Sequence, residues 1–241
     1  MVYPEMIIFD YGHTLLYEPG FDSLRGEEAL MKHIKSNKNN YTAEEINDFS
    51  QKIFKEICVV KGMDFELHEW QFRKFIYEYL GIELSISLPE AERIFWENTS
   101  PGDIMPNADK MIDYINSSNI RSAVISNIGF SGAVLTERIN RLLPNNKFEF
   151  IIASSDYMFR KPNHYIFELA LNKAGIDASK VWFCGDNPQA DIEGSASVGI
   201  FPVWYENLSI ENQWCKNRKA PNCEHLHIHD WKQLIEILES L

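Results

Sequence analysis

Residues 6–14 read Met-Ile-Ile-Phe-Asp-Tyr-Gly-His-Thr, an apolar run that ends abruptly at the carboxylate of Asp10. The apolar part predicts a buried strand over residues 5–10. A buried strand that delivers an aspartate to its carboxyl end is a common way to place a nucleophile or a metal ligand on an α/β sheet. We therefore interpret Asp10 as a functional residue rather than as a helix cap or a turn aspartate.

The part of the chain beyond residue 100 alternates between short apolar runs and helical patterns. Strands are predicted at 120–125, 148–153, 181–184 and 200–204, and helices near 107–118, 131–143, 163–174 and 189–197. A short apolar segment at 226–228 precedes an amphipathic helix at about 230–240. Alternation of this kind predicts an α/β fold with a doubly wound, mainly parallel sheet.

Residues 19–99 interrupt this alternation with a block that has helical character throughout. The predicted helices cover 22–37, 42–60, 68–80 and 88–98, and no strong strand signal lies between them. Thr42 and Glu45 have the spacing of a capping box. We therefore predict a helical cap domain at 19–99, inserted into an α/β core domain formed by 1–18 and 100–241, with hinges near 17–20 and 99–102.

The composition limits the class of partner. A net charge of −12 argues against nucleic acid or an anionic membrane as the main partner. A small anionic substrate is still compatible with this charge, because a cation at the site can reverse the local field. No apolar run approaches the length of a membrane span, and the N-terminus lacks a secretory-signal pattern, so a cytoplasmic location is expected. The four cysteines lack tight metal-ligand spacing, which fits reduced thiols. The oligomeric state is not indicated.

Further polar groups follow the later predicted strands. Ser126 and Asn127 follow one apolar run, Lys161 lies in the next loop, and Asp186 and Asp191 follow another run. Taken alone, the serine and asparagine are more typical of a cap and a turn, and the lysine of a solvated surface. The two aspartates suit a divalent-cation site built from oxygen ligands.

The joint pattern resembles the haloacid dehalogenase-like (HAD) hydrolase superfamily over nearly the whole chain. The matched motifs are Ile-Ile-Phe-Asp10-Tyr-Gly-His-Thr14, Val-Ile-Ser126-Asn127, Arg-Lys161-Pro, and Gly-Asp186 followed after four residues by Asp191. The block at 19–99 lies where this family inserts a helical cap, between the first and second motifs.

The resemblance implies a Mg²⁺-dependent hydrolase with a Rossmann-like core that acts on a small phosphorylated metabolite. Asp10 would be the nucleophile that forms an aspartyl-phosphate intermediate. The implied phosphate-binding residues are Ser126, Asn127 and Lys161, and the implied Mg²⁺ ligands are Asp10, the backbone carbonyl of Gly12, Asp186 and Asp191. Mg²⁺ and the lysine would offset the repulsion among the carboxylates.

Gly12 departs from the family pattern, in which phosphatases carry a second aspartate at this position as general acid and base. Such catalysis contributes about 10²–10⁴ in rate, so its loss is important. His13 is the nearest residue that could replace this acid, and we therefore expect it to be catalytic. Its position in the sequence nevertheless favours a side chain directed away from the substrate.

Three other interpretations of Gly12 stay open. The substrate has a good leaving group, such as an acyl phosphate. The enzyme cleaves another bond, as in dehalogenases or phosphonate-cleaving members; the latter use a cap lysine, for which Lys32, Lys35, Lys52 and Lys55 are available. The protein binds a phosphorylated ligand and turns it over slowly or not at all.

The cap is expected to select the substrate by closing over it. Phe21, Trp70, Phe72 and Tyr77 are the aromatic residues considered for such a pocket. Aromatic residues at helical spacing more often belong to a hydrophobic core.

Overall fold

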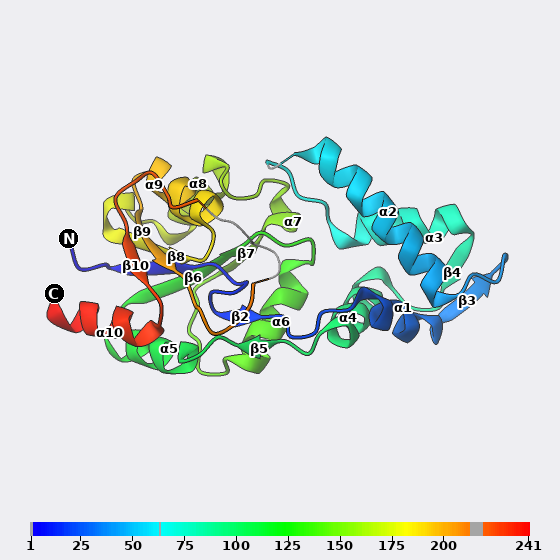
Figure 1. Ribbon diagram of the computed structural model, residues 1–241, viewed down its shortest axis with the longest axis horizontal. Coiled ribbons are helices and arrows are strands. Elements are labelled where there is room, and N and C mark those ends of the chain that lie inside the picture. The colour runs from blue at the N-terminus through cyan, green and yellow to red at the C-terminus, as the bar shows by residue number, and fades with distance from the viewer. Residues whose placement is uncertain (1, 63, 213–218) are drawn as a thin grey trace.

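A computed structural model describes residues 2–62, 64–212 and 219–241 of the chain. Its centre is a six-stranded sheet in the order β10-β9-β8-β1-β6-β7, in which every neighbouring pair is parallel (Figure 1). The strands are β1 (Met6–Phe9), β6 (Arg121–Ser126), β7 (Ile151–Ala153), β8 (Val181–Gly185), β9 (Phe201–Tyr205) and β10 (Leu226–Ile228). The order reverses around β1, which confirms the predicted doubly wound sheet and places a crevice at the carboxyl end of this strand.

The sheet is buried between two layers of helices, and β1 shows how. Its alternate side chains point to opposite faces: Ile7 and Phe9 pack with α5, α6 and α10, whereas Met6 and Ile8 pack with α8. These helices are α5 (Ala108–Ser117), α6 (Gly132–Leu142), α8 (His164–Ala174) and α10 (Trp231–Ser240). Burial on both faces explains why the strand is a continuous apolar run rather than an alternating pattern.

Three short helical segments follow strands β7 and β8 along the chain. They are α7 (Ser154–Tyr157), the π-helix η2 (Pro188–Glu193) and α9 (Gly194–Ser197), and a 3₁₀ turn η1 (Ala178–Lys180) precedes β8. The helix predicted at 189–197 is therefore η2 followed by α9. The Asn187 side chain accepts hydrogen bonds from the backbone of Gln189 and Ala190, which fixes the start of η2.

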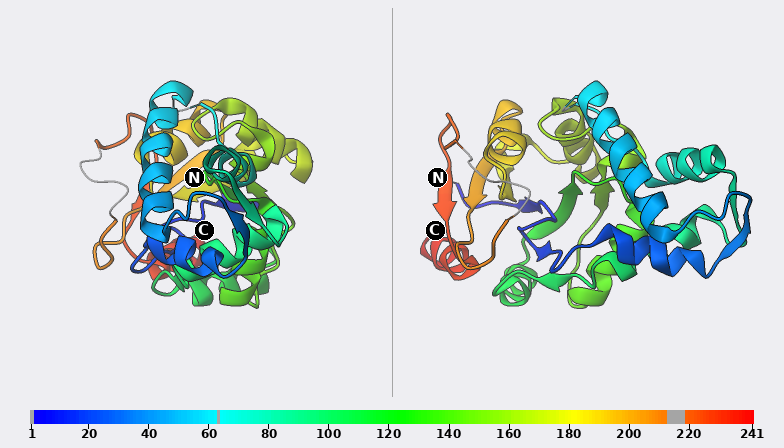
Figure 2. Two further views of the ribbon diagram at one scale, coloured as in Figure 1. Left: turned by 90° about the vertical axis from the view of Figure 1, so that its right-hand side faces the viewer. Right: turned by 45° about the vertical axis from the view of Figure 1, so that its right-hand side comes forward.

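The cap consists of four helices that stand clear of the sheet (Figure 2). They are α1 (Ser23–Met31), α2 (Ala43–Lys61), α3 (Glu69–Leu80) and α4 (Leu88–Thr99). The capping box of Thr42 and Glu45 is present at the start of α2. Leu30, Ile76 and Phe95 are among the residues that give the cap a hydrophobic core of its own.

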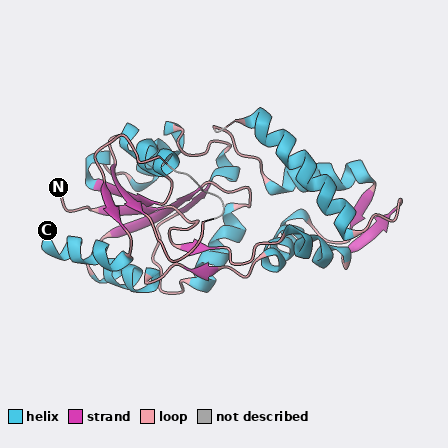
Figure 3. Ribbon diagram, viewed as in Figure 1, coloured by secondary structure: helices cyan, strands magenta, loops and turns pink. Residues whose placement is uncertain are grey.

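The prediction of an uninterrupted helix over 22–37 and of a cap without strands is wrong. Helix α1 ends at Met31, and β3 (Ile34–Asn37) pairs antiparallel with β4 (Ile82–Leu84) at the far end of the cap (Figure 3). The pairing partner lies more than forty positions away in sequence, so local periodicity does not reveal it. The pairing packs Ile34 and Ile82 against the cap core.

A second small sheet joins the two chain segments that connect cap and core. Strand β2 (Leu16–Tyr17) pairs antiparallel with β5 (Asp103–Ile104), and neither strand was predicted. Arg138 of α6 is buried beside this junction, where it donates to the carbonyls of Trp96 and Ser100 and pairs with Glu18 at 2.6 Å. Both connecting segments are therefore held to the core by one guanidinium.

Cys58, Cys184 and Cys223 are free thiols, and Cys215 lies outside the described residues. Within the described ranges, no helix combines the length and the apolar content that crossing a membrane requires.

Candidate active site

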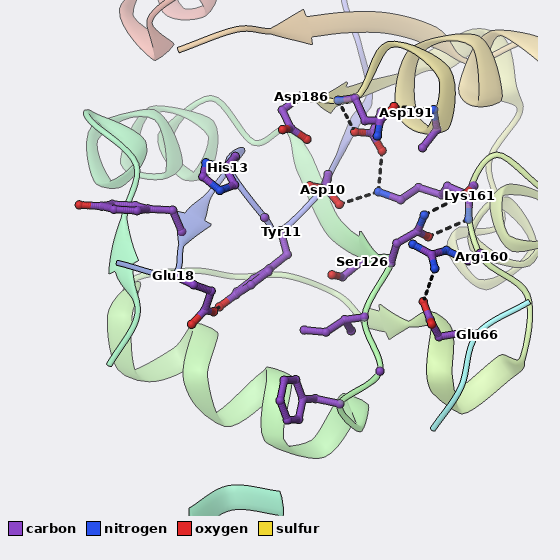
Figure 4. A pocket seen from close by; sticks show the side chains of 18 of the residues that line it. Asp10, Tyr11, His13, Glu18, Glu66, Ser126, Arg160, Lys161, Asp186 and Asp191 are labelled. Carbon is purple, nitrogen blue, oxygen red and sulfur yellow. Dashed lines mark hydrogen bonds and ion pairs between the residues drawn. The ribbon is translucent and has the colours of Figure 1, made fainter. Parts of the chain in front are cut away.

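A cavity of about 420 Å³ lies at the carboxyl ends of β1, β6 and β8, where the cap meets the core. All eight predicted site residues line it: Asp10, Gly12, His13, Ser126, Asn127, Lys161, Asp186 and Asp191 (Figure 4). They come together because parallel strands end at one edge of the sheet. Ser126 is the last residue of β6, and Asp10 and Asp186 directly follow β1 and β8.

Asp10 is buried at the end of β1, whose register with β8 is continued by a hydrogen bond from the Asp10 N–H to the carbonyl of Cys184. Lys161 Nζ lies 2.6 Å from Asp10 Oδ1, and Thr14 Oγ1 donates to Oδ2 at 3.3 Å. The pKa of Asp10 is raised to about 6, because the effect of burial exceeds the opposing effect of the Lys161 charge. The lysine thus keeps a buried carboxylate largely ionised at neutral pH.

Lys161 is almost completely buried and makes three polar contacts through its ammonium group. These join Nζ to Asp10 Oδ1 at 2.6 Å, to Asp191 Oδ1 at 2.7 Å and to the Ile125 carbonyl at 2.9 Å. Burial alone lowers the pKa of Lys161, but the two aspartates outweigh burial and raise this pKa above its ordinary value. Lys161 is therefore a fixed positive charge at the centre of the site.

Asn127 holds the backbone of Lys161 from both sides. Its Nδ2 donates to the Lys161 carbonyl at 2.7 Å, and its Oδ1 accepts from the Lys161 N–H at 2.7 Å. The side chain that sequence reasoning assigned to phosphate binding is thus engaged in positioning the lysine. The neighbouring Ser126 is buried and lines the cavity.

Three carboxylates converge beside the lysine. Asp10, Asp186 and Asp191 each offer an oxygen, and these oxygens lie within 4.8 Å of one another. Asp191 Oδ2 also accepts a hydrogen bond from the Asn187 N–H, and Asp186 Oδ2 accepts one from Asn212. Such a cluster is repulsive without a cation, and its hard oxygen donors fit Mg²⁺.

Gly185 makes the close approach of Asp191 possible. A Cβ at this position would lie 2.4 Å from both Cβ and Cγ of Asp191, which is closer than side-chain atoms tolerate. The glycine at the end of β8 therefore makes room for the second acidic residue of the cluster.

Gly12 and His13 occupy the rim next to Asp10. A Cβ built on Gly12 would meet no heavy atom within 4 Å, so the absence of a side chain there is not imposed by crowding. His13 has a φ of 55° and lines the cavity, although its sequence position favoured a side chain directed away from the substrate. In Figure 4 it lies on the other side of Asp10 from Lys161.

Three charged residues that line the cavity were missed by sequence reasoning, namely Glu18, Glu66 and Arg160. Arg160 lines the cavity next to Lys161, and its guanidinium lies 3.5 Å from Glu66 of the cap. Glu66 also accepts a hydrogen bond from Ser154 of the core at 3.0 Å. Arg160 was present in the quoted Arg-Lys-Pro motif, but its partner is set by how the cap docks.

Only part of the predicted aromatic lining is found. Phe21 lines the cavity. Trp70 and Tyr77 instead donate hydrogen bonds to buried cap carboxylates at 2.7 Å, and Phe72 packs against the cap core. Three of the four aromatic residues therefore pack inside the cap instead of lining the cavity, as is usual for aromatic residues at helical spacing. Phe54 of α2 also lines the cavity and was not predicted.

The cap is also tied to the core through Glu92 of α4, which is completely buried. Its carboxylate accepts hydrogen bonds from the backbone and the hydroxyl of Ser131, the residue that caps α6. Glu92 and Glu66 thus both hold the cap to the core through hydrogen bonds from core serines.

Known proteins resemble this chain in sequence and in fold. A family model described as haloacid dehalogenase-like hydrolase matches residues 47–204. The chain is 26% identical over 239 residues to pyrimidine 5'-nucleotidase YjjG of Escherichia coli, covering 96% of this chain and 97% of that protein. It is 26% identical over 200 residues to glyceraldehyde 3-phosphate phosphatase of Methanothermobacter thermautotrophicus, covering 82% and 83%.

Among solved structures, 2-haloacid dehalogenase from Pseudomonas syringae pv. Tomato DC3000 superimposes with a TM-score of 0.62 at 21% identity, covering 98% of each chain. At this identity the likeness concerns the fold. The fold is thus compatible with enzymes that cleave different bonds, and the bond must be argued from the residues of the site.

Proposed function

The chain belongs to the haloacid dehalogenase-like hydrolase family, and we propose that it is a Mg²⁺-dependent phosphatase acting on a small phosphorylated metabolite through Asp10. The observation that carries the proposal is the contact of Asp10 Oδ1 with Lys161 Nζ at 2.6 Å inside a cluster of three carboxylates. This arrangement supplies an ionised nucleophile, a fixed cation for phosphate oxygens and a set of oxygen ligands.

In the proposed reaction, an Asp10 oxygen attacks phosphorus and the bond from phosphorus to the leaving oxygen breaks. Water then attacks the phosphorus of the phosphoaspartyl group, which releases inorganic phosphate and regenerates the carboxylate. Lys161 and Ser126, which line the cavity, would hold non-bridging oxygens, while Asn127 would keep the lysine in position through its hydrogen bonds to the Lys161 backbone. The cap contacts of Glu66 favour exclusion of bulk water during these steps.

Mg²⁺ would be held by Asp10, Asp186, Asp191 and the carbonyl of Gly12. When bound, it would neutralise charge on the phosphoryl group and orient it. The convergence of the three carboxylates supports this cofactor, because a single lysine cannot balance them.

The glycine at position 12 restricts the substrate. No carboxyl group is available there to protonate a leaving alkoxide, so substrates with stable leaving groups, such as acyl phosphates, are favoured. His13 at the rim is the candidate for a replacement acid.

Other bond types are less well supported. Among the described residues that line the cavity, the only lysine is Lys161, so Lys32, Lys35, Lys52 and Lys55 are not placed for the covalent role of a cap lysine in phosphonate cleavage. The acidic cluster favours metal-dependent phosphoryl transfer over a metal-free dehalogenase mechanism.

The proposal is tested by steady-state assays of the purified protein with Mg²⁺ on acyl phosphates, aryl phosphates, nucleoside 5'-monophosphates and triose phosphates. The last two classes are chosen from the activities named for the relatives. We expect turnover of at least one class that requires Mg²⁺ and is abolished by Asp10→Asn. Binding of phosphate with no turnover in any class would instead identify a phosphate-ligand binding protein.

A further inference from the structure

Strand β10 lies at the edge of the sheet and contains His227, and the residues on either side of the strand include His225 and His229 at alternate positions. Alternate residues of a strand share one face. Ile228, between two of the histidines, packs into the core on the opposite face. His227 therefore lies on the face of this strand that is turned away from that core, and the ring centroids of His225 and His229 lie 6.3 Å and 4.5 Å from that of His227.

Glu206 is brought to the same place by the end of β9. Its N–H donates to the Ile228 carbonyl at 2.9 Å, which extends the parallel pairing of β9 and β10 by one residue. Its Oε2 lies 3.0 Å from His227 Nε2 and 3.9 Å from His229 Nδ1. One carboxylate oxygen and two imidazole nitrogens thus converge, all within 4.8 Å of one another.

We propose that Glu206, His227 and His229 form a binding site for a divalent transition metal of the zinc class, separate from the acidic cluster around Asp10. Two histidines and one glutamate are an established set of zinc ligands that leaves a fourth position for water. In a tetrahedral site with bonds of about 2.0–2.1 Å, neighbouring ligand atoms are about 3.3 Å apart. The distances of 3.0 Å and 3.9 Å from Glu206 Oε2 to the two imidazole nitrogens lie on either side of this value.

The imidazole of His227 is held in place before any metal binds. Its ring stacks on that of Trp204, with centroids 4.0 Å apart and planes inclined by 9°. The Trp204 indole N–H donates to the Asp186 carbonyl at 3.2 Å, which fixes the indole in turn. His229 Nδ1 contacts the Glu206 carbonyl at 2.9 Å, a contact that the metal would replace.

The donor atoms distinguish this site from the active site. Imidazole nitrogen suits zinc, nickel and copper, whereas Mg²⁺ strongly prefers oxygen. Excess Mg²⁺ therefore occupies the acidic cluster and leaves the histidines free to bind Zn²⁺. The side chains of Glu206, His227 and His229 are partly exposed, so an ion can reach them from solvent.

The test is a Zn²⁺ titration of the whole protein against a chromogenic chelator, in excess Mg²⁺. Wild type is expected to bind one zinc equivalent that His227→Gln or His229→Gln weakens by at least about 100-fold, since even the loss of an outer-shell partner costs 10–100-fold. Two matched controls should retain it: His225→Gln, which removes a neighbouring imidazole just before β10, and Asp186→Asn, which disrupts the acidic cluster.

Three results would overturn the proposal: unchanged zinc affinity in both histidine variants, an equal loss in His225→Gln, or loss of the zinc equivalent in Asp186→Asn. Circular dichroism without metal checks that each variant is folded. Glu206→Gln keeps the size of an exposed side chain and gives an independent test if a histidine variant fails to fold, with the same weakening expected and unchanged affinity counting against the site.

Discussion

Replacing Gly12 by aspartate is expected to raise kcat on alkyl phosphates by about 100-fold or more, because it supplies the acid that the site lacks. The structure has room for the change. A Cβ at Gly12 meets nothing within 4 Å, and the backbone is outside the left-handed region. The new carboxyl would share the cavity with Asp10, Asp186 and Asp191. Nearby negative charges raise the pKa of a carboxyl group, which favours the protonated form that an acid needs.

The size of the effect follows from the range for general acid–base catalysis, about 10²–10⁴ in rate, or about 2.7–5.4 kcal/mol of activation free energy. The gain should be confined to substrates whose leaving group needs a proton. Aryl and acyl phosphates release stable anions, so their kcat should change little.

The assay compares kcat for an alkyl and an aryl phosphate in wild type, Gly12→Asp and Gly12→Asn, the last being a control of equal size without an acid. Equal rates in the aspartate and asparagine variants would refute the reasoning, as would an equal gain on both substrates. His13→Ala completes the set: a loss restricted to the alkyl phosphate in wild type would assign the acid role to this histidine.

Three further predictions concern stability and metal binding. Because burial raises the pKa of Asp10 from 3.8 to about 6, the folded protein binds a proton that the unfolded chain has released, and thermal stability without metal should fall as pH rises from about 4 through about 6. Mg²⁺ should then raise Tm more at neutral pH than at pH 5; a pH-independent effect of Mg²⁺ on Tm would contradict this. Arg138→Met removes the cationic partner of the Glu18 carboxylate, which keeps only its hydrogen bond from the Tyr11 hydroxyl, and should lower the free energy of unfolding by about 3–5 kcal/mol in urea titrations; a change below about 1 kcal/mol would show that the ion pair is unimportant. Gly185→Ala should displace Asp191 and weaken Mg²⁺ binding measured by calorimetry; unchanged affinity would separate Asp191 from the metal site.

The core and most of the site could be predicted because they depend on strand ends. Buried parallel strands are recognisable as apolar runs, and their carboxyl ends meet at one edge, so the sequence alone places Asp10, Ser126 and Asp186 together. Asp191 followed from its spacing to Asp186, and Lys161 from the combined motif.

The remaining features depend on contacts between distant segments. Strands β3 and β4 are short, and each exists because of its partner. The pairing of Arg160 with Glu66 follows from the docking of the cap, which no local pattern encodes. An aromatic residue at helical spacing, such as Trp70, is compatible with either a core or a pocket position. The hydrogen bond from Trp70 to Glu92 holds this side chain inside the cap.

The most direct test of the central claim is chemical trapping of the phosphoaspartyl group during turnover. Borohydride reduction of the quenched enzyme, followed by peptide mass spectrometry, identifies the aspartate that carried the phosphoryl group. The account predicts that reduction converts Asp10 alone, only when substrate and Mg²⁺ are both present, and that Asp10→Asn yields no modified peptide. Undiminished hydrolysis in Asp10→Asn, or modification of a different carboxylate, would contradict it.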